Sequence, residues 1–311
     1  MGQTMIAKHL AKRFGMSIVV LWLTITAVFF AFASIPGDPA QMYAGSDTTP
    51  ELVQRLRQQF GTDRPVYVRY YLYLRNLLRG DLGDSFFSGR PVLAEVGPRF
   101  ANTALLALVS IACSTVTGVL LGVVSATSQS RAVEQVVSII TLLGISIPVF
   151  WLGLLLILLF SVKLGMLPAG GTGSLAHLLM PSLTLSVYPT AFITRMTRSS
   201  VLDVIRQDYV RTARAKGLPE RIVVFRHALS NALVPIVTVI GLRFGYLLGG
   251  AVVTESIFGW PGLGRLLVAA VGNRDYYLIQ GCILVFAASF VLINTLVDLS
   301  YFYLNPKVRY H

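Results

Sequence analysis

The chain has 311 residues, of which 54% are hydrophobic and only 13% are charged, and its formal net charge is +12. Runs 17–35, 103–128 and 149–162 contain no charged residue, and a helix that crosses a bilayer needs about 20 apolar residues. These runs lack the alternating polarity of membrane β-strands. The composition therefore argues against an ordinary soluble domain and predicts an all-α membrane protein with about six transmembrane helices.

The positive charge does not indicate a nucleic-acid partner. The basic residues alternate with the apolar runs instead of forming one face, which is typical of the cytoplasmic loops between membrane helices. The two cysteines, Cys113 and Cys282, both lie inside apolar stretches, so no disulfide framework is predicted.

The first predicted helix covers 15–35. Lys8, Lys12 and Arg13 precede it, and Ala31-Phe32-Ala33 resembles a signal-peptidase site, so a cleaved signal peptide is the alternative. The apolar run is longer than the roughly 7–15 residues of a signal-peptide core, which favours an uncleaved helix. Under both interpretations the chain from residue 36 onward lies outside the cytoplasm.

The polar stretch 36–100 is predicted to form a small extracytoplasmic subdomain. It opens with the turn-forming residues 36–39 and then offers two short amphipathic helices, 50–60 and 65–79. Three tyrosines of the second helix suit either an aromatic belt at the membrane surface or a docking face for a soluble partner, and these are Tyr70, Tyr71 and Tyr73.

Five further helices complete the predicted membrane core, at 101–126, 134–162, 178–200, 228–257 and 276–304. The chain then divides into a tail and first helix (1–35), the subdomain (36–100), the core (101–304) with a cytoplasmic segment (201–227), and a tail (305–311). Because short basic loops stay in the cytoplasm, both termini and segment 201–227 are predicted to be cytoplasmic. The basic residues of that segment are Arg206, Arg211, Arg214, Lys216, Arg221 and Arg226.

The sequence offers no catalytic centre of its own. No lysine follows a glycine, so a phosphate-binding loop ending in Gly-Lys is absent, and any use of ATP would fall to a partner chain. The four histidines are too scattered to suggest a metal site. Gly144-Ile145-Ser146 lacks the last glycine of a nucleophile elbow and lies in a predicted span. No enzyme activity, metal or cofactor is therefore predicted in this chain.

The stretch 203–231 is the most informative part of the chain. Residues 208–216 favour a short helix, and Gly217 and Pro219 end it before the next membrane helix begins. Such a helix on the cytoplasmic face can dock into another protein and pass motion to the two spans that it joins. The alternative is an ordinary basic loop that contacts lipid headgroups.

This stretch resembles the cytoplasmic coupling loop of binding-protein-dependent ABC importer permeases. Arg211-Thr212-Ala213 falls at the family's Glu-Ala-Ala positions, Gly217 at its glycine, and His227-Ala228-Leu229-Ser230 at its distal signature. Arg211, Thr212 and Ser230 depart from the general pattern. Asp208-Tyr209-Val210, Ala215-Lys216-Gly217 and Arg226–Asn231 nevertheless match the dipeptide, oligopeptide and nickel branch.

Other short motifs of the same branch occur in the same order along nearly the whole chain. They are Pro36-Gly37-Asp38-Pro39, Gly80-Asp81-Leu82-Gly83-Asp84-Ser85, Arg90-Pro91-Val92, Phe258-Gly259-Trp260-Pro261-Gly262-Leu263-Gly264, Arg274-Asp275-Tyr276, Val297-Asp298-Leu299 and Asn305-Pro306-Lys307-Val308-Arg309. The long loop after the first helix is typical of one of the two paired permease subunits of that branch.

The resemblance implies a type I ABC importer permease in the bacterial cytoplasmic membrane. It implies inward transport of di- or oligopeptides that an extracytoplasmic substrate-binding protein delivers. It further implies a second, homologous permease subunit, two ATPase subunits that bind ATP and Mg, and surrounding membrane lipid. Nickel or a metal chelate, an opine or another small solute remains the alternative cargo. A channel or an intramembrane enzyme is disfavoured, because no selectivity filter and no paired catalytic groups are evident. The residues expected to couple to the ATPase are Arg211, Thr212, Ala213, Ala215, Lys216, Gly217 and His227.

Two charges near the fifth helix are candidates for the translocation path. A charge in mid-membrane is costly and usually faces a cavity or a partner, so Arg243 is expected either to meet a peptide carboxylate or, as the favoured reading, to form a structural pair with Glu255 or a neighbouring subunit. Asp298 is expected to be a boundary or pairing charge. Gly241, Gly245, Gly249 and Gly250 form a stripe that indicates close helix packing.

Overall fold

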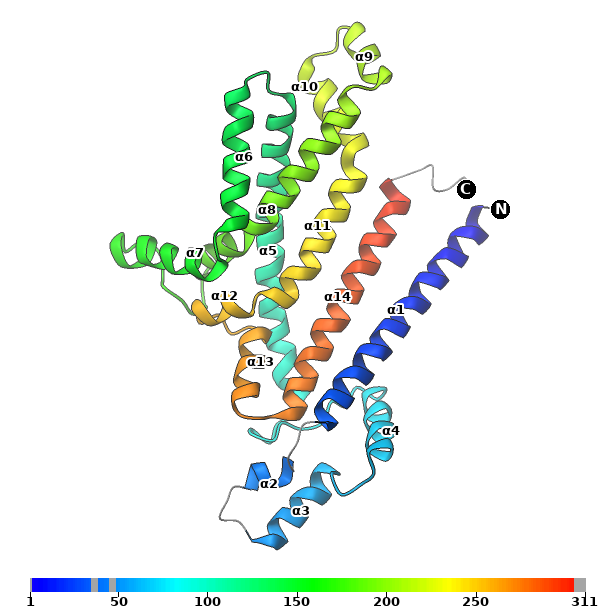
Figure 1. The fold of residues 1–311 in the computed structure, drawn as a ribbon, viewed down its shortest axis with the longest axis vertical. Helices are drawn as coiled ribbons and strands as arrows, with labels where there is room; N and C mark the ends of the chain where they lie inside the picture. The colour runs from blue at the N-terminus through cyan, green and yellow to red at the C-terminus, as the bar shows by residue number, and fades with distance from the viewer. Residues whose placement is uncertain (1, 35–38, 45–48, 305–311) are drawn as a thin grey trace.

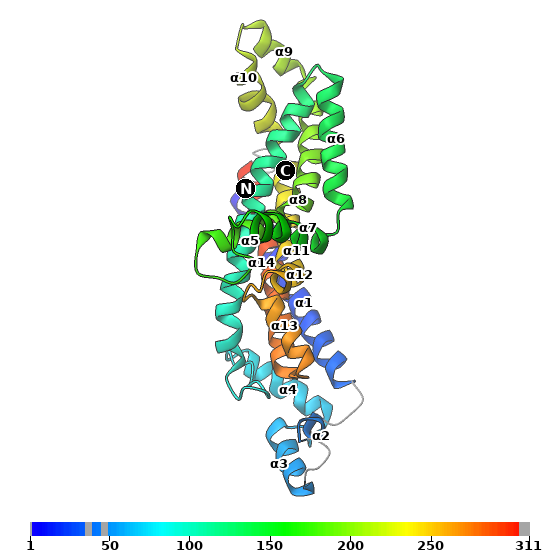
Figure 2. The same cartoon turned by 90° about the vertical axis from the view of Figure 1, so that its left-hand side faces the viewer.

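The computed structural model describes residues 2–34, 39–44 and 49–304. In these residues the chain is helical, and the only strand-like pairing described is an isolated bridge between Asp84 and Pro91. Long helices run side by side along the long axis of the molecule (Figures 1 and 2). They are α1 (Gly2–Ala33), α5 (Val92–Thr127), α6 (Arg131–Ser146), α8 (Leu175–Ile205), α11 (Ser230–Gly250) and α14 (Tyr276–Leu304).

Shorter helices lie at the two ends and at mid-height. They are α2 (Pro39–Ala44), α3 (Pro50–Phe60), α4 (Val66–Leu77), α7 (Val149–Leu156) with a π-helical continuation (Ile157–Lys163), α9 (Asp208–Ala215), α10 (Glu220–Ile222) with a π-helical continuation (Val223–Leu229), α12 (Val252–Ile257) and α13 (Leu263–Gly272). Helices α9 and α10 lie at one end of the molecule, and α2 and α3 lie at the opposite end (Figures 1 and 2).

In the described part of the chain, four helices are long and apolar enough to cross a membrane, or five if the bent pair α6–α7 counts as one span. The four are Lys12–Ala33, Val92–Thr127, Glu220–Gly250 and Tyr276–Ser300. Helix α8, predicted as a span over 178–200, is long enough at 31 residues but is less apolar. Helix α8 packs closely on α5, and several of its serine and threonine side chains are buried. These hydroxyl groups lower its apolar character.

The predicted single helix 134–162 is wrong, because the chain bends by 102° between α6 and α7. Ile147 has extended backbone angles, φ −76° and ψ 122°. The ring of the following Pro148 disfavours helical geometry at the preceding residue, which explains where the helix ends. Figure 1 shows α7 running across the long helices instead of along them.

The predicted helix 228–257 is also corrected at both ends. The helix begins at Glu220, so His227 belongs to its first turns, and it ends at Gly250 before the separate α12. Helix α13 was not predicted. Helix α5 begins at Val92 rather than at residue 101, with Pro98 inside it, so the predicted subdomain boundary at residue 100 falls within a helix.

Glycines let the long helices approach closely. A Cβ atom added to Gly122 of α5 would lie 2.5 Å from Thr197 of α8, and one added to Gly241 of α11 would lie 1.9 Å from Val297 of α14. A Cβ added to Gly245 would lie 3.0 Å from the Phe290 ring. Gly241 and Gly245 of the predicted glycine stripe thus allow close packing of α11 on α14. A Cβ on Gly249, in contrast, would meet nothing within 4 Å.

The first helix is tied to the rest by polar and aromatic contacts. Arg13 of α1 forms an ion pair with Asp298 of α14, which makes Asp298 a pairing charge as expected. Phe29 of α1 packs against the rings of Tyr70 and Tyr73, with centroids 5.2 and 5.5 Å away. Two of the three tyrosines thus dock α4 onto α1, whereas Tyr71 is 65% exposed.

Candidate coupling segment and central cavity

The turn between α8 and α11 is a small folded unit with its own core. Val210 and Ala213 of α9 are buried, at 0% and 5% exposure, and they pack with Val223, Leu218 and the last residues of α8. Asp208 stands in the first turn of α9, where a negative charge favours the helix N-terminus. The apolar spacing of three residues between Val210 and Ala213 thus holds one face of α9 against the molecule.

Gly217 ends α9 in a Schellman turn. The Gly217 N–H donates to the Arg214 carbonyl oxygen at 2.9 Å, and the Leu218 N–H donates to that of Ala213 at 3.4 Å. Gly217 has φ +74°, and a Cβ added to it would meet nothing within 4 Å. The glycine is therefore required by its left-handed backbone and not by lack of space.

The segment is closed by an ion pair across the turn. Arg214 donates from Nε and Nη2 to the two carboxylate oxygens of Glu220, at 3.1 and 2.6 Å. This two-point pairing fixes the direction of α10 relative to α9. Both side chains are largely exposed, so their role is mainly geometric rather than a large gain in stability.

The residues predicted to couple to an ATPase do not all share one face. Arg211, Thr212, Ala215, Lys216 and Gly217 are exposed on α9 and its turn. Ala213 is buried in the core of the unit, so it cannot contact a partner and instead supports the exposed residues. His227 is half-buried in the π-helical turn that follows α10.

Three exposed apolar side chains in this segment were missed. Tyr209, Ile222 and Phe225 are 44%, 40% and 44% exposed. Large apolar and aromatic groups that a structure leaves in solvent are the usual anchors of protein interfaces. The signal that the sequence offers for them is Tyr209, an aromatic residue directly after Asp208 at the acidic start of a short helix.

A cavity of about 1060 Å³ lies between α6, α8 and α11, on the side of the molecule that carries α9. We call it the arginine cavity, because four arginines line it: Arg195, Arg198, Arg206 and Arg243. Arg198 forms an ion pair with Glu134, but its Nε is buried without a described partner. Asp203 also lines the cavity, so the lining has an excess of positive charge that suits an anionic molecule.

Arg243 is held by aromatic rings and not by a carboxylate. Its guanidinium carbon lies 3.6 Å from the Phe192 ring centroid and 5.5 Å from that of Tyr188. Among the residues that the structure describes, Arg243 makes no ion pair. The expected pairing of Arg243 with Glu255 is therefore not found.

Glu255 is fully buried at the other end of α11, on α12. Its Oε1 accepts from the Thr103 hydroxyl at 2.6 Å, and its Oε2 accepts from the Arg265 backbone N–H at 3.0 Å. A Cβ added to Gly262 would lie 2.1 Å from Oε1. Glu255 thus caps the N-terminus of α13 and joins it to α5, a structural position that does not line the arginine cavity.

The glycine-rich motif after α12 completes this junction. The Trp260 indole N–H donates to the Asn102 carbonyl oxygen at 3.1 Å, and the Asn102 amide donates to the Pro261 carbonyl oxygen at 2.9 Å. A Cβ added to Gly264 would lie 2.7 Å from the Val252 Cα. The motif therefore fixes α12 and α13 to the first part of α5.

The chain folds as a bundle of long apolar helices with a folded turn at one end, and solved membrane transporters share this fold. An inward-facing MetNI methionine ABC transporter has this fold, with a TM-score of 0.54, 22% identity, and 70% of this chain and 96% of that chain covered. The crystal structure of an amino acid ABC transporter with histidines gives a TM-score of 0.52, 16% identity, and coverage of 66% and 93%. The fold is thus that of type I ABC importer permeases.

Sequence comparison gives the family. The chain belongs to the family described as binding-protein-dependent transport system inner membrane component, which matches residues 118–310, and the family's N-terminal region matches residues 5–107. It is 44% identical to the glutathione transport system permease protein GsiC of Escherichia coli O6:H1, over 97% of this chain and 99% of that protein. The GsiC protein of Pectobacterium atrosepticum is 43% identical over the same shares. The chain is therefore an ABC importer permease subunit, whose ATP hydrolysis and substrate capture belong to partner proteins.

Proposed function

We propose that this permease carries small peptides with free carboxylates, of the size of glutathione, into the cytoplasm. The observation that supports this cargo is the arginine cavity between α6, α8 and α11, whose lining holds four arginines and a single aspartate. Arginine recognises carboxylates through two parallel hydrogen bonds, and it does so most strongly where water is excluded. The similarity to permeases named for glutathione transport favours a peptide-like cargo over nickel, for which this lining offers few suitable ligands.

We propose further that α9 and its turn dock on an ATPase subunit, and that a second, homologous permease subunit completes the path. The exposed face of α9 carries Arg211, Thr212, Ala215 and Lys216, and Tyr209 stands beside them. The buried Val210 and the ion pair between Arg214 and Glu220 fix this face relative to α8 and α11. Movement of the docked ATPase would then tilt both long helices as one body.

Transport in liposomes tests the cargo. The complex is purified through a tag on this chain and reconstituted with its binding protein, and ATP-driven uptake is compared for a tripeptide, the same tripeptide with an amidated C-terminus, and Ni²⁺. We expect uptake of the free tripeptide, with a reduction of about tenfold or more for the amide, since one charge-assisted hydrogen bond contributes about 1.5–3 kcal/mol. Uptake of Ni²⁺ but not of either peptide would show that the proposed cargo is wrong.

A further inference from the structure

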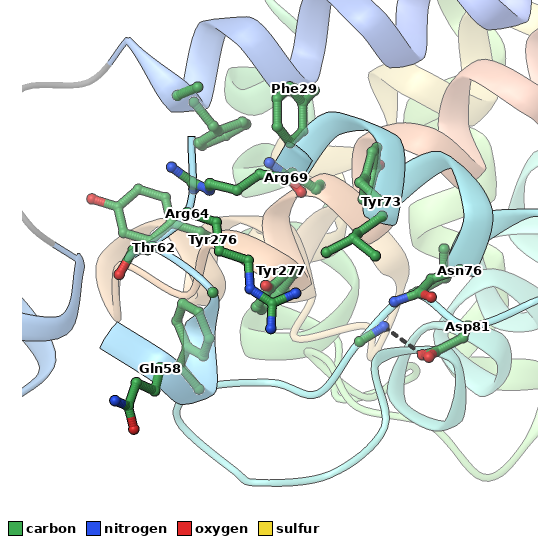
Figure 3. A pocket seen from close by; sticks show the side chains of 18 residues that line it. Phe29, Gln58, Thr62, Arg64, Arg69, Tyr73, Asn76, Asp81, Tyr276 and Tyr277 are labelled. Atoms are coloured by element: carbon green, nitrogen blue, oxygen red, sulfur yellow. Dashed lines mark hydrogen bonds between the residues drawn. The ribbon is translucent and has the colours of Figure 1, made fainter. Parts of the chain in front are cut away.

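A second, smaller cavity of about 270 Å³ lies at the opposite end of the molecule from α9. Its walls come from the end of α1, the turn between α3 and α4, α4 itself, the loop before α5 and the start of α14. Figure 3 shows the labelled side chains around it, with Asn76 and Asp81 together at one end. The cavity is thus built from five separate segments of the chain.

The cavity holds polar groups that lack partners. The exposed Arg64 and the half-buried Arg69 line it, and neither makes an ion pair or a side-chain hydrogen bond with the residues that the structure describes, although Arg69 lies close enough to Tyr277 to interact with it electrostatically. Gln280 also lines it, is only 8% exposed, and its amide has no hydrogen bond within the same residues. The Gln280 amide therefore opens into the cavity, and together with the two guanidinium groups it offers hydrogen-bond donors to a ligand that enters there.

The remaining wall is aromatic, and its tyrosines can donate hydrogen bonds. Phe29, Phe32, Tyr73, Tyr276 and Tyr277 line the cavity. Burial, with a smaller contribution from the neighbouring Tyr277, raises the pKa of Tyr73 to about 12. At neutral pH the Tyr73 phenol therefore stays protonated and can donate a hydrogen bond to an anionic oxygen.

The cavity lies at the depth where two membrane spans end. Span Lys12–Ala33 ends at Ala33 and span Tyr276–Ser300 begins at Tyr276, and both of these residues line the cavity. Lipid headgroups and interfacial tyrosines occupy this depth. Phe30, one residue from the lining residue Phe29, is 43% exposed on α1 and offers a surface along which an acyl chain can lie.

We propose that this cavity binds the headgroup phosphate of a phospholipid. Arg64 and Arg69 hold the phosphate oxygens, because guanidinium groups match their geometry with two hydrogen bonds. Gln280 and Tyr73 complete the set of donors, and Asp81 at the other end suits the ammonium group of a zwitterionic headgroup. The lipid would fill the joint between α1, α4 and α14, and this role does not depend on which solute is transported.

Retention of lipid by the purified complex tests this proposal. Native membranes are extracted with detergent, and the phospholipid retained per complex is measured by mass spectrometry for the unchanged protein and for Arg64→Gln/Arg69→Gln. We expect about a tenfold loss of retained phospholipid or more, because the charge-assisted hydrogen bonds from both arginines to the phosphate are removed. Gln280→Leu should lower retention as well, and melting temperatures establish that each variant is folded.

The matched control is Arg75→Gln/Arg79→Gln, which removes the same charge from exposed positions at the end of α4 that do not line the cavity. It should retain lipid normally. Equal retention by both double variants would overturn the proposal. So would displacement of the lipid by a soluble tripeptide or by inorganic phosphate at levels that saturate the arginine pair, because the site would then take a soluble anion.

Discussion

Glu255 and Arg243 lie on consecutive helices, yet their surroundings give them opposite roles. Glu255 is fully buried and its oxygens accept from Thr103 and from the start of α13. Arg243 lines the large cavity with its guanidinium against the Phe192 ring. Glu255 therefore joins α12 and α13 to α5, whereas Arg243 lines the cavity that we propose receives the transported molecule.

Replacing Glu255 should impair folding before it impairs transport. In Glu255→Ala the Thr103 hydroxyl and the Arg265 N–H lose their acceptor and a buried void remains, and we expect a cost of about 1–3 kcal/mol for each group left unpaired. Glu255→Gln keeps one acceptor and should cost less. Thermal unfolding in detergent measures both, and an alanine variant that melts normally would contradict the capping role.

Replacing Arg243 should have the reverse effect. Arg243→Ala leaves no buried partner unpaired, so we expect normal amounts of assembled complex. Uptake of peptides with free carboxylates should fall about tenfold or more, because a charge-assisted hydrogen bond is lost. Arg243→Lys keeps the charge and should retain part of the activity. Poor assembly of Arg243→Ala with unchanged transport per complex would instead support a structural role.

Residue patterns in the sequence identify positions with an unusual chemical character, but they do not always identify the contacts that these residues make. The costly charge at Arg243 was identified from its depth in an apolar segment, whereas its aromatic partners were not, because Tyr188 and Phe192 come from a different helix. Ala213 was assigned to the docking face from motif alignment, but the burial of α9 on one side decides its position. Contacts of this kind depend on tertiary packing, which local patterns do not report.

At the scale of elements, the sequence predicts best those helices that have a clear start residue, such as proline, and a clear stop residue, such as glycine. Helix α3 has the predicted bounds, between the proline at its start and Gly61 at its end, where φ is +65°. The break at Pro148 was missed because the apolar run continues through it, and hydropathy alone does not distinguish a bent helix from a straight one. Helix α13 was missed because its ten residues are too few to give a span-like signal.

Gly217 tests the coupling role of α9. Its φ of +74° is disfavoured for a side chain with a branched Cβ, so Gly217→Val should distort the turn that ends α9. The membrane helices should insert normally, while co-purification of the ATPase or transport is lost. The matched control is Gly217→Asn, because asparagine tolerates this backbone conformation and the site has open space.

Normal uptake by Gly217→Val would remove the structural argument for coupling at this turn. The alternative, a basic loop on lipid headgroups, predicts instead that removing Arg211, Arg214 and Arg221 together abolishes activity while the glycine variant remains active. Expression, ATPase co-purification and uptake of both variants separate the two interpretations.

At the scale of the whole molecule, the fold places the α8–α11 turn and the subdomain after α1 at opposite ends. Helices α9 and α10 lie at the end where α11 begins, and α2 to α4 lie at the other end with the start of α14 (Figures 1 and 2). The basic residues of the α8–α11 turn favour the cytoplasm for its end, and the subdomain would then face outward.

Labelling of single cysteines in intact cells tests this orientation. In a background without Cys113 and Cys282, a cysteine at Asp63 should react with an impermeant thiol reagent added outside, and one at Pro219 should react only after the cells are opened. Both positions lie in exposed turns and neither lines a described cavity, so access is not limited by packing. The reverse pattern would invert the topology and exclude inward transport driven from the α9 end.

Helix α5 connects the junction around Trp260 to the cavity lined by four arginines, and its length has a mechanical consequence. Asn102 is tied to Trp260 and Pro261, and Ser125 lines the arginine cavity. The helix between them is about 35 Å long, so a tilt of about 5° around the tied point moves its far end by about 3 Å. A small rotation of α5 about its junction at Asn102, together with the tightly packed α8, would therefore be enough to move the wall of the cavity that Ser125 forms.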